Sequence, residues 1–121
     1  MKTVVTRSNE AGESYFEERD VAFSDKSFAP PAAPFAVSDP EPSTALMFIS
    51  LPAGWDDVTH TSPRCQTLVA ISGTVRVTTS DGAAREMGPG AVWRMEDVRG
   101  KGHHTRVIGE EPYLAAIVQH E

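Results

Sequence analysis

Residues 60–73 read HTSPRCQTLVAISG, a polar half followed by an apolar half that closes on glycine. The sequence predicts one strand over about residues 60–72, with an edge position or a bulge at Pro63 because proline donates no backbone hydrogen bond. Polar side chains at every second position of a strand share one face. Here they are His60, Ser62, Arg64 and Gln66. Polar groups on one face of an otherwise apolar strand indicate a lined cavity inside a small barrel.

The rest of the chain predicts an all-β fold. No segment keeps apolar residues at helical spacing over three turns, whereas short β-branched runs recur between turn residues. The predicted strands lie at about residues 45–51, 74–79, 84–87, 91–95, 103–108 and 113–119, after an N-terminal hairpin that pairs residues 2–6 with 14–17. Short strands at such regular turn spacing are typical of a sandwich or a barrel.

A proline-rich segment separates the hairpin from the predicted barrel. Residues 27–43 read SFAPPAAPFAVSDPEPS, and proline removes the donors that a central strand needs. We expect an extended connector over the surface. The sequence therefore predicts two parts: residues 1–44, a hairpin and connector that pack on or exchange with a partner barrel, and residues 45–121, the barrel itself.

Composition excludes some classes of partner. With 121 residues the chain makes one domain, and 11 Lys and Arg against 17 Asp and Glu give a net charge of −6. An acidic chain does not favour nucleic acid, and no apolar run approaches the ~20 residues of a membrane span. The start of the chain lacks the features of a signal peptide. A single cysteine, Cys65, makes the reducing cytoplasm the expected location and a packed structural thiol its expected role.

The glycine framework resembles a known family. The series Gly54-x5-His60-x-Ser62-x3-Gln66-x6-Gly73 resembles the first cupin motif, in which a glycine, two histidines, a glutamate and a glycine stand at these intervals. A second set of residues resembles the second cupin motif and the start of small single-domain cupins: Gly88-Pro89-Gly90, Glu96-Asp97, Gly100-Lys101-Gly102-His103, and Val4-Val5-Thr6 with Gly12.

The resemblance implies a double-sheet jelly-roll barrel that pairs as a homodimer and holds a metal through three histidines and a glutamate. His60 and His103 match the first and last histidines, whereas Ser62 and Gln66 replace the second histidine and the glutamate. The remaining set, His60, Gln66 and His103, suits Fe, Ni, Zn or Mn at reduced affinity. The alternative is a metal-free pocket in which His60 and Gln66 hydrogen-bond each other or a water. No organic cofactor is implied.

Other polar residues are candidates for ligand binding or catalysis. Strand alternation points Arg64 inward, where it either clamps a ligand carboxylate or pairs internally with Glu96 or Asp97. Ser62 and Trp55 are expected to line the ligand pocket, with Trp55 as its roof. One member of the Glu96-Asp97 pair either acts as general base or supports a histidine, or the pair caps a loop.

Two further histidines and a tryptophan need separate assignments. On a regular strand His103 faces the barrel interior and His104 faces outward. We expect His120 to be a solvated residue of the C-terminal tail. Trp93 belongs either to the core or to an interface.

These features leave three hypotheses for the function. The first is a binding protein for a small anionic molecule, held by Arg64. The second is a metal-assisted oxygenase, isomerase or decarboxylase of a small organic acid, with His60, Gln66 and His103 as ligands. The third is a metal-independent isomerase or dehydratase with His60 or His103 as general base. The sequence favours a pocket for a small acidic organic molecule.

Overall fold

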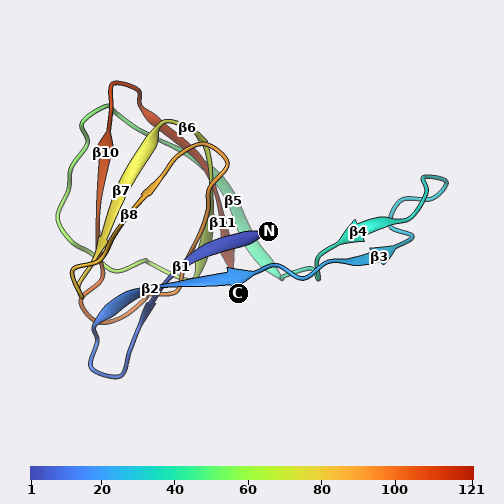
Figure 1. Ribbon diagram of the computed structural model, residues 1–121, viewed down its shortest axis with the longest axis horizontal. Helices are drawn as coiled ribbons and strands as arrows, with labels where there is room; N and C mark the ends of the chain where they lie inside the picture. Colours follow the sequence, from blue (N-terminus) through green and yellow to red (C-terminus); the bar gives the residue numbers. More distant parts are fainter.

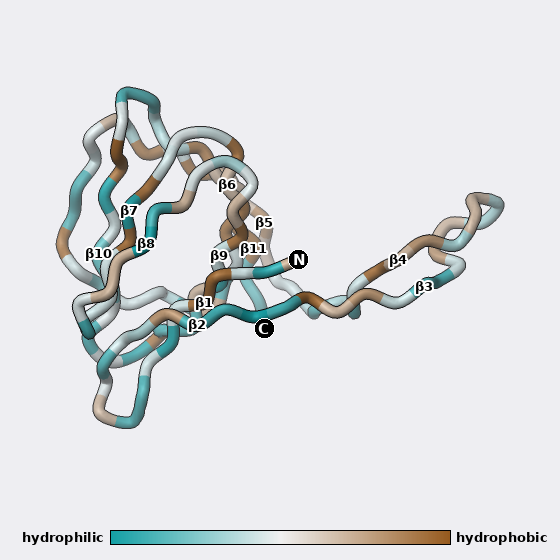
Figure 2. The backbone as a smooth tube through the Cα atoms, viewed as in Figure 1, coloured by the Kyte–Doolittle hydropathy of each residue, from teal (hydrophilic) through white to brown (hydrophobic).

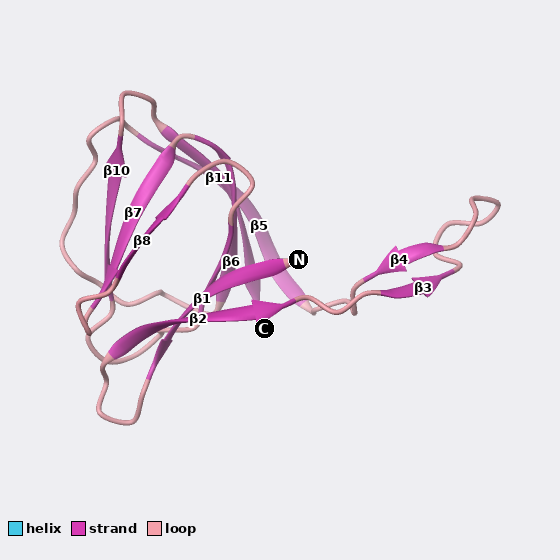
Figure 3. Ribbon diagram, in the orientation of Figure 1, coloured by secondary structure: helices cyan, strands magenta, loops and turns pink.

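The computed structural model describes residues 1–121, and every regular element is a strand (Figure 3). The eleven strands are β1 (Lys2–Ser8), β2 (Ser14–Asp20), β3 (Ser24–Lys26), β4 (Phe35–Val37), β5 (Ser43–Leu51), β6 (Gln66–Ser72), β7 (Thr74–Thr79), β8 (Ala84–Met87), β9 (Val92–Met95), β10 (His103–Ile108) and β11 (Tyr113–His120). The all-β class is confirmed. No helix is long and apolar enough to cross a membrane.

Two sheets form the barrel (Figure 1). The larger sheet has the order β2-β1-β9-β6-β11-β5, and the smaller has the order β10-β7-β8. All neighbours are antiparallel except β1 and β9, which run parallel. The N-terminal hairpin thus lies within the large sheet of its own barrel. Exchange of this hairpin with a second barrel, and the division at residue 44, stay predictions.

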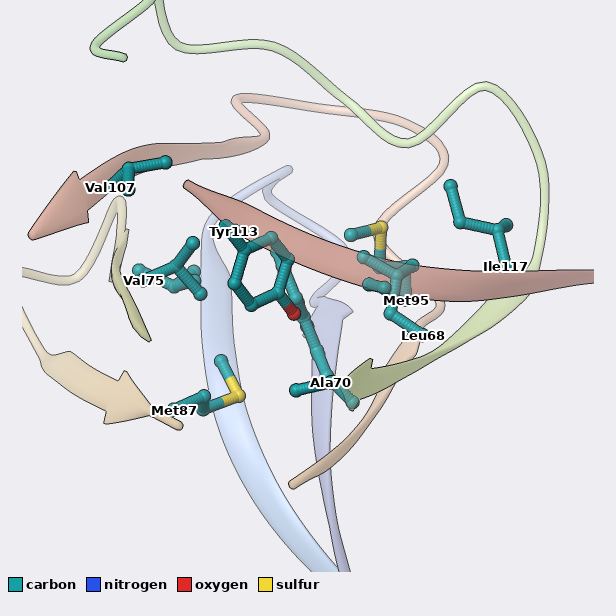
Figure 4. Close-up of a cluster of buried hydrophobic side chains, with 11 residues drawn as sticks. Leu68, Ala70, Val75, Met87, Met95, Val107, Tyr113 and Ile117 are labelled. Carbon is teal, nitrogen blue, oxygen red and sulfur yellow. The ribbon is translucent and has the colours of Figure 1, made fainter. Parts of the chain in front are cut away.

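The core lies between the two sheets, where both contribute alternate, inward-facing residues (Figure 4). Strand β6 buries Leu68 and Ala70, while β7 of the opposite sheet buries Val75 and Val77. Alternation of buried and exposed positions is the pattern expected of strands that pack on one face only. This arrangement is the predicted double-sheet jelly roll.

Most strand predictions are confirmed, and one is wrong. The ranges 74–79, 84–87 and 103–108 coincide with β7, β8 and β10, and the other predicted barrel strands differ by one or two residues at an end. The predicted strand over residues 60–72, in contrast, begins only at Gln66. Residues 61–65 form a loop around Pro63, and His60 makes an isolated bridge to His103. The predicted alternation of side chains between two faces therefore does not hold for the residues before Gln66.

The proline-rich connector is also different from the prediction. Its Phe35–Val37 segment pairs with Ser24–Lys26 in a small antiparallel hairpin, which projects away from the barrel instead of lying on its surface (Figure 1). We call residues 24–37 the arm. Proline does not prevent this hairpin because the three-residue strand β4 itself contains none.

Gly73 provides a test of how tightly the strands pack. Gly54 and Gly73 share a φ of 77°, which disfavours any side chain, but only at Gly73 would a Cβ overlap backbone, at the carbonyl of Pro112. We predict that Gly54→Ala lowers the free energy of unfolding by about 1–2 kcal/mol, the ordinary cost of the left-handed conformation. Gly73→Ala should lose at least about 2 kcal/mol more, because backbone must move. Equal losses in urea unfolding would contradict this packing.

Candidate functional site

A cavity opens between the two sheets of the barrel. It has a volume of about 150 Å³, and eight of the fourteen residues that border it are hydrophobic. The polar residues at its wall are His60, Ser62, Gln66, His103 and Thr105, and Trp55 and Tyr113 also border it. A concave, mainly apolar cavity with a few polar groups is the usual form of a small-molecule site.

His103 is the polar group that the fold holds most firmly. Its side chain is 1% exposed, and Nδ1 lies 2.5 Å from Oδ2 of Asp97, which is fully buried. The other carboxylate oxygen of Asp97 accepts a hydrogen bond from the Thr6 hydroxyl at 2.9 Å. That hydroxyl in turn accepts from the Trp93 indole N–H at 3.1 Å. In this series of hydrogen bonds every donor points toward Asp97. Because a carboxylate only accepts, His103 presents Nδ1–H to Asp97.

The opposite ring nitrogen of His103 is free to meet a ligand. Nε2 has no hydrogen-bond partner within the chain, and no fully buried side-chain nitrogen or oxygen lacks a partner. Because His103 borders the cavity, Nε2 must reach that space. In the neutral ring this atom accepts a proton, and in the charged ring it donates one.

His60 lies beside His103 at the mouth of the cavity. The two ring centres are 5.3 Å apart, and the strandlike bridge between residues 60 and 103 holds the two backbones together. Nδ1 of His60 lies 2.9 Å from the carbonyl oxygen of Val58, which can only accept. His60 therefore also keeps its proton on Nδ1 when neutral. Unlike His103, it is exposed to solvent.

Tyr113 supplies a neutral donor to the same cavity. Burial raises the pKa of its phenol to about 12, so the hydroxyl keeps its proton at neutral pH. The hydroxyl has no partner within the chain although the residue is only 2% exposed, and by the reasoning used for His103 it reaches the cavity. The site thus combines an imidazole Nε2 with a phenol donor among apolar walls.

Comparison with solved structures identifies the architecture. The Schizosaccharomyces pombe Cnp3 cupin domain is similar to this chain with a TM-score of 0.53 and 19% identity, over 100% of this chain and 83% of that one. The chain has the cupin fold. Protein NMB1881 from Neisseria meningitidis is similar with a TM-score of 0.46 and 18% identity, over 63% of this chain and 72% of that one. No protein-family model and no curated protein matches the sequence.

The residues at the positions where the resemblance implies metal ligands do not fit a four-ligand metal centre. The side-chain oxygen of Gln66 accepts a hydrogen bond from the side-chain amide of Gln119 at 3.1 Å. The side-chain amide of Gln66 donates to the Met95 sulfur at 3.3 Å. The Ser62 hydroxyl donates to the Arg64 carbonyl at 2.7 Å. No group of three or more His, Cys, Asp or Glu is placed to hold a metal. Metal binding through His60, Gln66 and His103 stays a prediction. In the metal-free alternative, the direct hydrogen bond between His60 and Gln66 is not formed, because Gln66 bonds to Gln119 and Met95. Hydrogen bonds of the two residues to a water stay a prediction.

Arg64 and Glu96 lie outside the cavity. Because residues 61–65 form a loop, the Arg64 side chain is exposed, and its Nη1 donates to the Thr44 hydroxyl at 3.4 Å. The inward orientation of Arg64 is wrong, and so is its pairing with Glu96 or Asp97. Glu96 instead bonds to Arg19 at 2.8 Å and Arg94 at 2.5 Å on the barrel's outside, away from any position for a general base.

The remaining candidates divide between correct and incorrect predictions. His104 faces outward as expected and bonds to Asp56 at 2.5 Å, and Trp93 belongs to the core. His120 is not a solvated tail residue, since it is 8% exposed and its Nε2 lies 2.8 Å from the Thr67 hydroxyl. Cys65 is half-buried, and burial raises the pKa of its thiol, which agrees with a structural role.

Two residues of this site carry no site prediction from the sequence, Thr6 and Tyr113. The sequence places Tyr113 only on a strand and Thr6 on a strand and in the resemblance to the start of small cupins. It does name Asp97, as one of two candidates for the support of a histidine. Thr6 reaches the site through the parallel pairing of β1 with β9, which joins residues about ninety positions apart. The residues next to Thr6 in the sequence do not indicate that its strand pairs with one so distant. Alternation within β11 does place Tyr113 on the inner face, a signal that was available.

The external ion pairs predict how the protein responds to acid. Burial alone would raise the pKa of Glu96, but the hydrogen bonds of Arg19 and Arg94 lower it below its usual 4.5, and Arg94 likewise lowers the pKa of Glu41. A carboxyl whose pKa is lower in the folded state stabilises that state above its ordinary value and loses this contribution as the pH falls. We predict that the free energy of unfolding drops below pH 4.5 and that Glu96→Gln reduces this drop.

Urea unfolding at neutral pH and at about pH 3.5 measures the difference. Glu110→Gln is the matched control, because Glu110 is exposed and forms no ion pair. An unchanged acid response in Glu96→Gln, or an equal change in both variants, would contradict the assigned role of Glu96.

Proposed function

We propose that the cavity binds a small weak organic acid and shares the acid's proton with His103. The observation that supports this most strongly is the buried Asp97–His103 pair, with Nε2 left free at the cavity. A neutral imidazole Nε2 accepts from a carboxylic acid, an enol or a phenol. Once the proton has moved, the imidazolium lies between the ligand anion and Asp97. The charge that develops inside the barrel is therefore compensated on both sides.

Size and lining define the rest of the ligand. An apolar cavity of about 150 Å³ is large enough for benzene, so the bound acid carries an apolar part of about that size. Trp55, Leu68 and Ile117 supply apolar wall, and the Tyr113 phenol offers a hydrogen bond to a carbonyl or carboxylate oxygen. Arg64 has no part in this binding mode because it lies outside the cavity.

The same geometry supports proton-transfer chemistry without a metal. A histidine that a carboxylate orients, with its other nitrogen directed at a ligand, is the arrangement of a general base. In a bound 2-oxo acid His103 would remove a proton from the carbon beside the carbonyl and return it to another atom, which is an isomerisation. This favours the metal-independent isomerase among the three hypotheses, while a binding protein without turnover would use the same contacts.

Benzoate is a suitable probe because it combines one carboxylate with a benzene-sized apolar part. We predict that benzoate raises the melting temperature and that its affinity increases roughly tenfold per unit decrease in pH while ligand and His103 are both deprotonated, since one proton enters with the ligand. Benzamide, of the same shape, has no such proton to share and should bind more weakly and independently of pH.

Variants separate this proposal from its alternatives. His103→Ala should abolish benzoate binding, Tyr113→Phe should weaken it without removing a side chain from the core, and Arg64→Ala should leave it unchanged. Loss of binding in Arg64→Ala but not in Tyr113→Phe would contradict the proposal. Metal measured at stoichiometric level by elemental analysis, with binding abolished by chelator and restored by Fe, Ni, Zn or Mn, would support the metal-assisted hypothesis instead.

A further inference from the structure

Thr105 is buried in the barrel without a partner for its hydroxyl. The residue is 7% exposed and follows His103 by two positions on β10, so both side chains lie on the inner face of that strand. Thr105 borders the cavity, and its hydroxyl forms no hydrogen bond within the chain. Since no fully buried side-chain oxygen lacks a partner, this hydroxyl must reach the open space of the cavity.

The other buried serines and threonines all have a structural partner. Each donates its hydroxyl to an oxygen of the chain, and they are Thr3, Thr6, Ser14, Ser62 and Thr79. Packing does not require a hydroxyl at position 105, because its inner-face neighbours Val77 and Val107 are both valines. A buried hydroxyl without a partner destabilises a protein relative to a valine of the same shape. The Thr105 hydroxyl is therefore available to a ligand.

Thr105 and His103 lie at different depths of the same wall. Two strand positions separate them, which is about 7 Å of backbone. Strand β10 starts with hydrophilic residues and ends in hydrophobic ones (Figure 2), and Thr105 stands between His103 and the apolar Val107. A ligand of about the size of benzene that places its acid group at His103 can therefore extend along the wall to Thr105.

We propose that the ligand is a hydroxy acid and that Thr105 bonds to its hydroxyl. This rests on the proposed function, because His103 must hold the acid group at one end of the apolar part while Thr105 meets the hydroxyl at the other. A threonine hydroxyl both donates and accepts, so a ligand hydroxyl satisfies it in either direction. A ligand with only apolar atoms at this point would leave Thr105 unpaired, which selects against it.

Isothermal titration calorimetry with matched pairs of acids tests the role of Thr105. In para-hydroxybenzoate and para-methylbenzoate, and in the corresponding meta pair, size and acidity are similar but only one member carries a hydroxyl. We expect the wild type to bind the hydroxy member of at least one pair roughly three- to tenfold more tightly. Thr105→Val should abolish this preference and still bind benzoate. Thr78→Val is the matched control, because Thr78 stands opposite the outward-facing His104, and it should keep the preference.

The outcomes separate Thr105 from the proposed function. If benzoate binds but neither pair shows a preference, or if the preference survives in Thr105→Val, the role of Thr105 is overturned and the proposed function stands. If none of these acids binds, both are overturned. Without ligand, Thr105→Val should melt at the wild-type temperature or above it, because the variant loses an unpaired hydroxyl. A clearly lower melting temperature would mean that the hydroxyl is bonded within the protein, and would also overturn the proposal.

Discussion

The Asp97 carboxylate, fully buried and hydrogen-bonded to Thr6 and His103, is the constraint on which the barrel and its site depend. An ionised carboxylate is stable away from water only when hydrogen bonds or charges compensate it. Its two partners come from β1 and β10, so the N-terminal strand must dock on β9 and the loop after β9 must return to β10 before the carboxylate is satisfied. The carboxylate is therefore satisfied only when β1, β9 and β10 are all in place.

The same constraint explains how a barrel with the cupin fold can keep an oriented histidine at its cavity although two of the expected ligand positions have changed. Ser62 and Gln66 direct their polar atoms to neighbours in the barrel wall, and their hydrogen bonds make them part of the structure. His103 alone is oriented by a buried carboxylate with its other nitrogen open to the cavity. The chemistry that we propose for this site is exchange of a proton with a bound molecule, which needs an oriented imidazole.

Much of the fold could be predicted from sequence because a strand is recognisable from its own residues and the turns beside it. Alternation and turn residues located β7, β8 and β10, and the same alternation separated His103 from His104. Prediction failed where the chain departs from a strand: Pro63 breaks the run before Gln66, so Arg64 turns to solvent. It also failed where partners are distant. The contacts of Thr6 with Asp97 and of His120 with Thr67 depend on strand order, which composition and spacing do not determine.

The position of the proton on the His103 ring is the most direct test of the proposed site. In protein labelled with ¹⁵N in its four histidines, the ring nitrogen shifts in alkaline buffer report which nitrogen carries the proton, and His103→Gln assigns the signals. We predict one tautomer for neutral His103, with the proton on Nδ1 and none on Nε2, and loss of this preference in Asp97→Asn. A proton on Nε2 in the wild type, or an even mixture of tautomers, would contradict the orientation of His103 by Asp97.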